Sequence, residues 1–240
     1  MQETFEQIPD NFLVGWGKRL RRPLNRWLHN QSAIGAGPFF EAKMLPGIGL
    51  LSDNWEMIRT EAEALLVNRA EIPPLGRISP DHRRIARDSS WKSFFLCGHG
   101  YKIPANCARC PATAALLDRI PGVVVAFFSI FEPGTHVPEH YGLTKALLNV
   151  HLGLIVPNGI YRCEIRVRDE IRRWSPGQLL IFDETYNHEA WNLTDQPRVV
   201  LFLHVRRPMR WAGSLVSWLF LAAVRRTTVV QDARRALAAG

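Results

Sequence analysis

Histidine is the residue type in this sequence that most clearly suggests chemistry, because a neutral imidazole can bind a metal ion and can also carry a proton. The chain contains eight histidines. Five of them lie in or beside a long stretch rich in β-branched and aromatic residues: His136, His140, His151, His188 and His204. A single histidine on a strand usually has a structural role, so the useful signal is a pair brought together from two strands.

His140 and His188 have the placement that a metal-binding pair requires. His140 precedes an apolar run at 147–156, and His188 follows another at 178–182. Non-haem iron(II) oxygenases bind the metal through a small set of imidazole and carboxylate ligands on one side, which leaves positions for a bidentate co-substrate and for dioxygen. The sequence therefore predicts that His140 and His188 are iron(II) ligands.

A series of predicted strands has to position these histidines. Runs rich in β-branched and aromatic residues occupy 123–130, 147–156, 160–168, 171–174, 178–182 and 198–205. Turn sequences separate some of them, at Pro157-Asn158-Gly159 and Ser175-Pro176-Gly177. Short strands at this spacing favour an antiparallel sandwich or barrel. We predict a mainly β fold with helices on its flanks.

Helices are predicted before these strands. Asp53-Asn54-Trp55-Glu56 has the spacing of a capping box and opens a helical pattern that runs to Asn68. Residues 77–90 have the composition of a polar loop. A short helix is predicted over 112–120, directly after Pro111.

Positive charge is concentrated at the two ends of the chain. The formal net charge is +8, and the excess comes from residues 1–30 and 206–240, whereas 31–205 are balanced. A nucleic-acid module would carry its cations on the folded domain, among aromatic residues, so this distribution argues against nucleic acid as a partner. We predict one catalytic domain over 51–208, an irregular basic extension over 1–50, and a basic amphipathic helix over 209–240.

The C-terminal segment 209–226 reads MRWAGSLVSWLFLAAVRR. Its uncharged stretch is shorter than the roughly 20 residues that a membrane-spanning helix needs. It is typical of a helix on a membrane surface, with tryptophan at the interface and arginine against anionic headgroups; docking on the domain's own sheet is the alternative. The basic, aromatic stretch 15–28 lacks the pattern of a secretory signal. We predict a cytoplasmic protein in peripheral contact with the inner membrane.

Cys107 and Cys110 have the spacing of metal ligands, with Cys97 and His99 as the nearest candidates for two more. Four such ligands would form a structural zinc site. The alternative, which we favour, is a set of reduced thiols in a cytosolic protein.

Several stretches resemble one known family, in the same order along the chain. They are 128–140 (FSIFEPGTHVPEH), 151–154 (HLGL), 177–183 (GQLLIFD), 188–191 (HEAW) and 198–208. Over roughly residues 50–210 the chain resembles the aspartyl/asparaginyl β-hydroxylases, which are 2-oxoglutarate-dependent dioxygenases related to the bacterial lipid A hydroxylases. The resemblance implies a double-stranded β-helix, a jelly-roll or cupin-like dioxygenase core, with His140 and His188 as the two iron(II) ligands.

The resemblance also implies how 2-oxoglutarate and O2 serve as co-substrates. Ser129 and Arg198 match the pair that binds the distal carboxylate of 2-oxoglutarate, His151 matches a residue near the proximal carboxylate, and Trp91 matches a side chain lining the pocket. The planar fork of a guanidinium suits a carboxylate. The implied reaction converts 2-oxoglutarate and dioxygen to succinate and carbon dioxide and hydroxylates an unactivated carbon.

Two residues depart from patterns found among these enzymes. Gly142 follows the first predicted ligand where many iron oxygenases carry Asp or Glu; the aspartyl/asparaginyl hydroxylases share this glycine, and Glu139 or Asp183 could supply a carboxylate. Asn149 stands where the family usually has an Arg near the proximal carboxylate. Lys145 could compensate for that missing cation.

The sequence leaves the substrate open. The His-x-Gly pattern favours the β-carbon of a peptidyl Asp or Asn, which we place first. The FDETY sequence at 182–186 and the basic apolar tail favour an acyl chain of lipid A or another membrane lipid. From another class, a non-catalytic cupin-like binding or scaffold protein is favoured by Asn149 and by the missing carboxylate.

Overall fold

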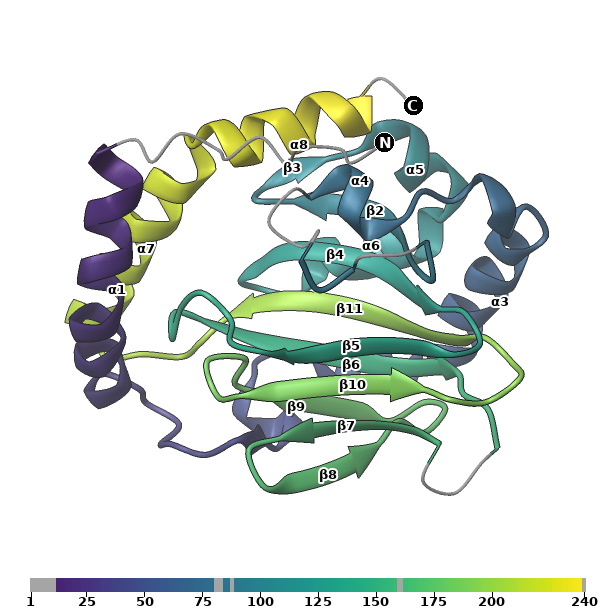
Figure 1. Ribbon diagram of the computed structural model, residues 1–240, viewed down its shortest axis with the longest axis horizontal. Coiled ribbons are helices and arrows are strands. Elements are labelled where there is room, and N and C mark those ends of the chain that lie inside the picture. Colours follow the sequence, from purple (N-terminus) through teal and green to yellow (C-terminus); the bar gives the residue numbers. More distant parts are fainter. Residues whose placement is uncertain (1–11, 80–83, 87–88, 159–161, 239–240) are drawn as a thin grey trace, which may run out of the picture.

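Two antiparallel sheets face each other in the computed structural model of the protein, which describes residues 12–79, 84–86, 89–158 and 162–238 (Figure 1). The seven-stranded sheet has the order β1 (Phe39–Phe40), β9 (Leu179–Phe182), β6 (Leu147–Ile155), β11 (Arg198–Arg206), β4 (Val123–Phe131), β2 (Trp91–Gly98) and β3 (Tyr101–Lys102). The four-stranded sheet has the order β5 (Thr135–His140), β10 (His188–Asn192), β7 (Cys163–Val167) and β8 (Glu170–Arg173).

From β4 onward the chain moves back and forth between the two sheets. Strands β4, β6, β9 and β11 belong to the larger sheet, and β5, β7, β8 and β10 belong to the smaller one. This alternation produces a double-stranded β-helix, or jelly roll. The predicted mainly β fold with flanking helices is confirmed.

Strand β6 illustrates how the larger sheet separates its two faces. Leu148, Val150 and Leu152 join a core cluster that includes side chains of the helices, whereas Asn149 and His151 alternate with them and face the smaller sheet. A shift of one residue in register would exchange these two sets. The helices that supply this outer layer are α2 (Gly49–Asp53), α3 (Trp55–Leu66), α5 (Pro104–Arg109) and α6 (Pro111–Arg119).

The space between the sheets has its own core. Phe127, Phe182 and Phe202 of the larger sheet pack in one cluster with Val137 and Ile165 of the smaller sheet. This second core is rich in aromatic side chains and contains the polar residues singled out by the sequence. It is therefore the layer in which a site has to be sought.

The helix predicted over 53–68 begins later than expected. Asp53 is the last residue of α2, and Asn54 occupies the position before α3 without a side-chain capping bond. The Nδ2 group of Asn54 instead donates to the carbonyl of Leu50 (2.8 Å). The predicted capping box is wrong because Asp53 already belongs to the preceding helix, whereas the helix predicted over 112–120 is confirmed as α6.

The segment predicted as a polar loop at 77–90 is only partly one. The short helix η2 (Arg69–Glu71) precedes it, and α4 (Leu75–Ile78) covers its first two residues. Ile78, Ile85 and Ala86 are buried, so the loop contributes to the core. Residues 80–83, 87–88 and 159–161 lie outside the described residues, including part of the predicted turn at 157–159 and the start of the strand predicted at 160–168; β7 begins at Cys163.

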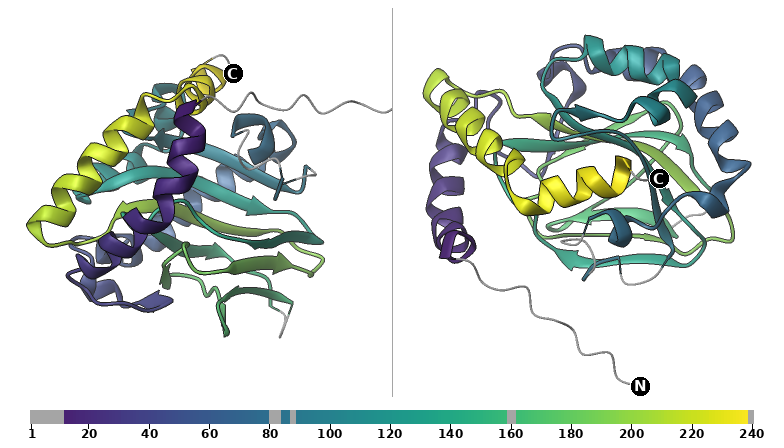
Figure 2. Two further views of the ribbon diagram at one scale, coloured as in Figure 1. Left: turned by 60° about the vertical axis from the view of Figure 1, so that its left-hand side comes forward. Right: turned by 90° about the horizontal axis from the view of Figure 1, so that it is seen from above.

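A helix from the N-terminal part of the chain and one from the C-terminal part pack together beside the sandwich. Helices α1 (Phe12–Asn30) and α7 (Trp211–Arg225) lie side by side there (Figures 1 and 2). Ser32 forms an isolated bridge with Met209, and the Arg210 N–H donates to the Gln31 carbonyl (2.8 Å). The irregular extension predicted over 1–50 is wrong for α1 and for the short η1 (Ala42–Met44).

Helix α8 (Thr228–Ala238) turns back across the end of the larger sheet near β2 and β3 (Figure 2). The preceding helix, α7, buries one side, with Gly213, Ser217 and Leu221 against the protein. One side of α7 therefore packs against the protein, as in the alternative in which this segment docks on its own domain. The other side of α7 is exposed.

Candidate active site

His140 and His188 lie directly opposite each other on neighbouring strands of the smaller sheet. They pair in the register of β5 and β10, and the centroids of their rings are 4.0 Å apart. His140 is the last residue of β5 and His188 the first of β10; both strands were absent from the sequence prediction. The structure brings the two predicted ligands together at one end of the sandwich.

Both rings are held by backbone carbonyls through Nδ1. His140 Nδ1 lies 2.8 Å from the Pro138 carbonyl, and His188 Nδ1 lies 3.0 Å from the Tyr186 carbonyl. A carbonyl can only accept, so each Nδ1 carries the proton and the ring lone pair is on Nε2, the arrangement that second-shell bonds impose on metal-binding histidines. Burial lowers the pKa of His188, which favours the neutral ring that binds metals.

Glu184 occupies the space beside Gly142. A Cβ on Gly142 would overlap the Glu184 side chain, and the Gly142 N–H donates to the Glu184 carbonyl (2.6 Å). The Glu184 carboxylate accepts from His204 Nε2 (3.1 Å). Burial opposes its ionisation, but the neighbouring His204 lowers the pKa of Glu184 to about 2. A charged carboxylate therefore fills the place of the side chain missing at 142.

The two acids named from the sequence are engaged elsewhere. Glu139 accepts from Arg166 Nη2 (2.6 Å). Asp183 pairs with Arg207 and with Lys145 Nζ (2.6 Å). Among the described residues there is no group of three or more His, Cys, Asp or Glu side chains placed to bind a metal. The expectation that Glu139 or Asp183 could supply the missing carboxylate is wrong. The acid that lies beside Gly142 is Glu184, which the sequence analysis did not name.

We expect Gly142→Asp to fail as a simple repair of the missing carboxylate. The new side chain would overlap Glu184, and such overpacking costs about 1–3 kcal/mol, so the single variant should melt lower and bind iron(II) no better. Gly142→Asp combined with Glu184→Ala should restore the melting temperature. Calorimetry and iron(II) titration test this, and a single variant as stable as the parent would contradict it.

Lys145 does not replace the arginine missing at 149. Its ammonium group is held by Asp183 and lies over the Tyr186 ring at 4.1 Å from the centroid. Asn149 is buried opposite His204 in the sheet register, and its Oδ1 has no hydrogen-bond partner among the described residues. The idea that Lys145 compensates is wrong.

Arg198 is buried, and its charge has no hydrogen-bonding or acidic partner in the described part of the chain. It is 1% exposed, and none of its three guanidinium nitrogens has a hydrogen-bond partner among the described residues. The group lies over the rings of Phe131 (3.6 Å) and Trp174 (4.5 Å), and burial lowers the pKa of Arg198 to about 9. A buried charge is costly unless it is paired, so this site is suited to a bound anion.

The other polar groups near Arg198 also offer hydrogen-bond donors. His151 Nδ1 accepts from Trp174 Nε1 (3.1 Å), so its proton is on Nε2, which is buried and unpartnered among the described residues. Burial and the Arg198 charge lower the pKa of His151 well below its usual value. Ser129 Oγ accepts from Trp91 Nε1 (3.0 Å), which leaves its hydroxyl proton to donate. The layer between the sheets thus presents hydrogen-bond donors around Arg198, as a bound anion requires.

His99 adds a pH dependence to this end of the protein. Burial, with a contribution from His204, lowers the pKa of His99 to about 4. The unfolded chain takes up a proton below about 6.5 and the folded protein does not. The contribution of neutral His99 to the free energy of unfolding is therefore fully present above pH 6.5, and it is lost as the pH falls toward 4.

We expect His99→Asn to remove about 1–2 kcal/mol of the loss in unfolding free energy between pH 6.5 and 4, so the melting temperature of the variant should fall less over this range. Asparagine tolerates the positive φ of 48° at this position. Thermal melts across this pH range provide the measurement, and an unchanged slope would contradict the assignment.

The four cysteines are free thiols, of which Cys110 and Cys163 are buried and Cys97 and Cys107 are half-buried. Burial raises the pKa of Cys97 to about 11 and of Cys110 to about 12. Cys107 Sγ donates to the Leu96 carbonyl (3.3 Å). The Cys97 and Cys110 thiols are therefore protonated at neutral pH, and the described residues contain no group of three or more metal-binding side chains that would favour the zinc alternative.

Comparison with known proteins identifies relatives of two kinds. The family model described as Aspartyl/Asparaginyl beta-hydroxylase matches residues 52–208. The chain is 40% identical over 206 residues to an ornithine lipid ester-linked acyl 2-hydroxylase of Rhizobium tropici, across 86% of this chain and 71% of that protein. It is 31% identical over 191 residues to human aspartyl/asparaginyl beta-hydroxylase, across 76% of this chain but only 24% of the human protein.

Among solved structures, a cupin 2 conserved barrel protein from Salinispora arenicola aligns with a TM-score of 0.35 and 11% identity, over 64% of this chain and 92% of that one. The match of the family model to more than half of the chain is the stronger finding. The chain belongs to the aspartyl/asparaginyl β-hydroxylase family.

Proposed function

We propose that the protein is an iron(II)- and 2-oxoglutarate-dependent hydroxylase. The observation that carries this proposal is the buried guanidinium of Arg198, which has no hydrogen-bond partner in the part of the chain that the structure describes. It shares the layer between the sheets with the pair His140 and His188. A dicarboxylate that chelates iron with one end requires a cation for the other end. These residues fit both requirements.

Each residue has a separate part in holding the reactants. His140 and His188 would bind the metal through Nε2, and Arg198 with Ser129 would bind the distal carboxylate. His151 Nε2–H would donate to the proximal carboxylate. When bound, iron(II) with 2-oxoglutarate and dioxygen supplies the oxidising chemistry. The aromatic walls exclude water from the site.

Two further side chains would support this set. Trp174 fixes the tautomer of His151 by donating to Nδ1. Glu184 places a negative charge beside the histidine pair, which would partly balance the charge of a divalent metal. Neither residue was predicted from the sequence.

Anaerobic titration with iron(II) and 2-oxoglutarate tests the proposal. Chelation of iron(II) by the co-substrate should produce a weak visible charge-transfer band, and oxygen should then convert 2-oxoglutarate to succinate. If no band forms and no succinate appears, the non-catalytic cupin-like scaffold is the better interpretation.

For the substrate, we now place an acyl chain of a membrane lipid ahead of a peptidyl Asp or Asn. The relative with 40% identity is named for hydroxylation of an ornithine lipid acyl chain, and α7 presents an apolar surface to solvent. Expression should add the mass of one oxygen to extracted membrane lipids. Unchanged lipids together with hydroxylated Asp-containing peptides would restore the peptide as the first candidate.

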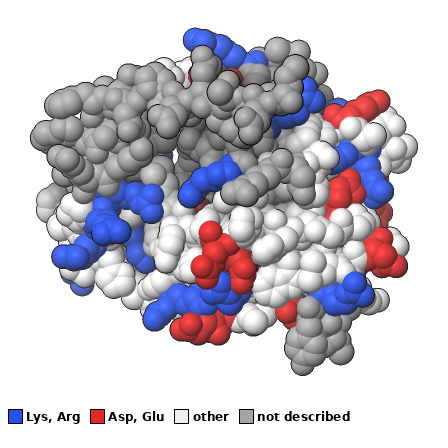
Figure 3. All heavy atoms as spheres, viewed as in Figure 1, with Lys and Arg blue, Asp and Glu red and all other residues white. Residues whose placement is uncertain are grey.

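The apolar surface of α7 supports peripheral contact with a membrane, which we propose to be the cytoplasmic face of the inner membrane. Its exposed large side chains recur at helical spacing: Trp211, Leu215, Trp218 and Leu219. The neighbouring helix α1 contains Arg21, Arg22 and Arg26, and basic side chains gather on that side of the molecule (Figure 3). No helix in the described part of the chain is long and apolar enough to cross a bilayer.

Replacing Trp218 and Leu219 with serine should weaken binding to anionic vesicles by about tenfold or more, because each exposed side chain buries apolar area on contact. Co-sedimentation with vesicles measures the loss. Val67→Ser, which removes an exposed apolar side chain at the end of α3 and outside α7, is the matched control. Equal binding of all three proteins would contradict the proposed surface.

A further inference from the structure

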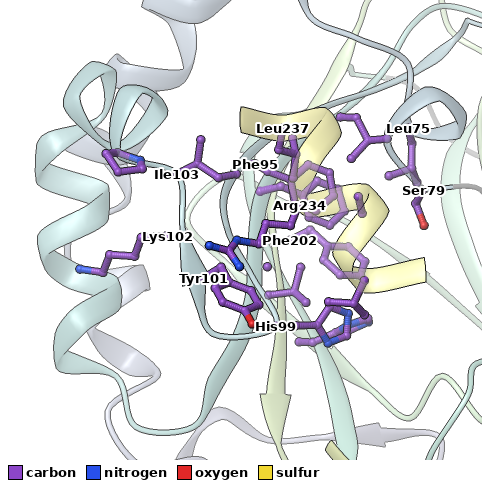
Figure 4. A pocket seen from close by; sticks show the side chains of 18 of the residues that line it. Leu75, Ser79, Phe95, His99, Tyr101, Lys102, Ile103, Phe202, Arg234 and Leu237 are labelled. Atoms are coloured by element: carbon purple, nitrogen blue, oxygen red, sulfur yellow. The ribbon is translucent and has the colours of Figure 1, made fainter. Parts of the chain in front are cut away.

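A cavity of about 420 Å³ lies between α8 and the inner face of the larger sheet (Figure 4). We call it the α8 chamber. Its floor is formed by aromatic and aliphatic side chains of the sheet, namely Phe95, Val125, Phe127 and Phe202. Its roof is formed by Val230, Ala233 and Leu237 of α8, and α4 closes one side with Leu75 and Ile78. The volume and the apolar lining are those of a pocket for a small ligand.

The α8 chamber shares a wall with the candidate active site. Trp91 lines the chamber and donates to Ser129. Phe202 also lines it, and its ring centroid is 4.8 Å from that of His151. A ligand in the chamber would therefore lie next to the residues proposed to hold 2-oxoglutarate.

A second connection leads toward the histidine pair. His204 lines the chamber and donates to the carboxylate of Glu184. Glu184 fills the space beside Gly142, two residues after His140. One hydrogen-bonded pair, His204 with Glu184, thus links the chamber wall to the end of β5 that carries the first proposed metal ligand.

The rim of the chamber combines positive charge with apolar side chains. A neighbouring cavity of about 540 Å³ shares His99 and Tyr101 with the chamber and is lined by Arg206, Arg225 and Arg226. The same cavity includes Trp218 and Leu219 of the exposed stripe on α7. An apolar interior beside a basic and apolar rim matches an amphiphile with a hydrocarbon chain and an anionic group.

Contacts to Tyr101 hold the roof in place. The guanidinium groups of Arg225 and Arg234 lie over its ring, 4.2 Å and 4.3 Å from the centroid. Gln231 Nε2 is 3.5 Å from the Tyr101 hydroxyl. These contacts tie α8 and the end of α7 to β3, so that the chamber is part of the folded protein.

We propose that the α8 chamber receives the hydrocarbon chain of the substrate, while the carbon to be hydroxylated lies at the histidine pair. This inference rests on the proposed hydroxylase function and names the part of the protein that selects the chain. The basic rim would hold the polar end of the amphiphile near the membrane.

Filling the chamber tests this assignment. Gly98 lines it, and a Cβ at Gly98 meets no other atom within 4 Å, so Gly98→Leu can enter the space without a backbone clash. Ala233→Phe fills it from the roof. Thr228→Phe, at an exposed position on the same helix, is the matched control.

The measurement is the rise in cis-parinaric acid fluorescence when this polyene fatty acid binds the full-length protein. We expect Gly98→Leu and Ala233→Phe each to weaken binding by about tenfold or more, and Thr228→Phe to leave it unchanged. The charge-transfer band with iron(II) and 2-oxoglutarate should persist in all four proteins. The proposal would be overturned if both filled variants bound the fatty acid as tightly as the unaltered protein. It would also be overturned if Thr228→Phe weakened binding as much as they do.

Photocrosslinking of a diazirine-labelled fatty acid to the unaltered protein gives a second readout that does not depend on the folding of a variant. Crosslinks should map to β2, β11 and α8; crosslinks confined to α1 and α7 would overturn the proposal. If the chamber binds fatty acid but the unaltered protein forms no charge-transfer band, the hydroxylase function fails while the chain-binding site stands. Vesicles of anionic lipid, used as competitor, distinguish a membrane lipid from a free fatty acid.

Discussion

Replacing Arg198 with methionine is expected to abolish measurable 2-oxoglutarate binding and, at the same time, to raise the melting temperature of the protein. The guanidinium is buried with no hydrogen-bond partner among the described residues, so without an anion it destabilises the fold. An apolar side chain of similar length removes that cost, by about 1–3 kcal/mol. For a domain of this size each kcal/mol corresponds to about 2–4 °C.

The functional loss should be large, because the distal carboxylate of 2-oxoglutarate would enter a pocket without its cation. We expect the affinity for 2-oxoglutarate to fall by about 100-fold or more, since a charge-assisted bidentate pair contributes more than an ordinary hydrogen bond. Isothermal titration and the charge-transfer band measure the affinity, and calorimetry measures the melting temperature. Arg198→Lys should retain part of the affinity through charge alone.

Arg207→Met is the matched control for this prediction. Arg207 is also a buried arginine, but its guanidinium pairs with Asp183. Removal of this partner leaves a buried carboxylate with Lys145 as its remaining cation, so the melting temperature should fall. If both variants melt lower than the parent protein, the argument from the unpartnered charge of Arg198 is wrong.

Replacing either His140 or His188 with alanine is expected to eliminate the charge-transfer band and the turnover of 2-oxoglutarate. The site has two imidazoles and no third ligand group among the described residues, so the loss of one leaves a single protein ligand. Loss of a group that only hydrogen-bonds to a metal ligand lowers metal affinity by about 10–100-fold. Because these variants lose a ligand itself, we expect iron(II) affinity to fall by more than that. Iron content after dialysis and succinate formation measure the effect.

His136→Ala is the control for these two variants. His136 lies on the same strand as His140, is exposed, and faces Glu189 at 3.4 Å. Its removal should leave iron binding and turnover unchanged. A comparable loss in all three variants would mean that the integrity of the smaller sheet, and not the histidine pair, supports the activity.

The amino-acid sequence by itself determined the class of fold and the residues most suited to the chemistry. Alternation along β6 and the apolar runs of β4 and β11 are local patterns, so strands could be predicted there from the chain alone. The types and order of His140 and His188 indicated a metal site, and the resemblance to a known family assigned Arg198 to a dicarboxylate, both without reference to distance.

The strands that carry the histidine pair were not predicted. Strand β5 has the sequence THVPEH, with Pro138 inside it, and β10 has the sequence HEAWN. Such short polar segments become strands because their neighbours supply hydrogen-bond partners, which is a property of the assembled sheet. The pairing of His140 with His188 depends on that register.

Only the tertiary structure decided which charges are paired and which are not. Arg198 and Arg207 are both buried arginines in one stretch of sequence, yet Asp183 reaches Arg207 and leaves Arg198 without a partner among the described residues. Glu184 likewise gains its place beside Gly142 because two distant loops meet. Burial and pairing arise from contacts between segments far apart in the chain, and for that reason residue types and spacing do not contain them.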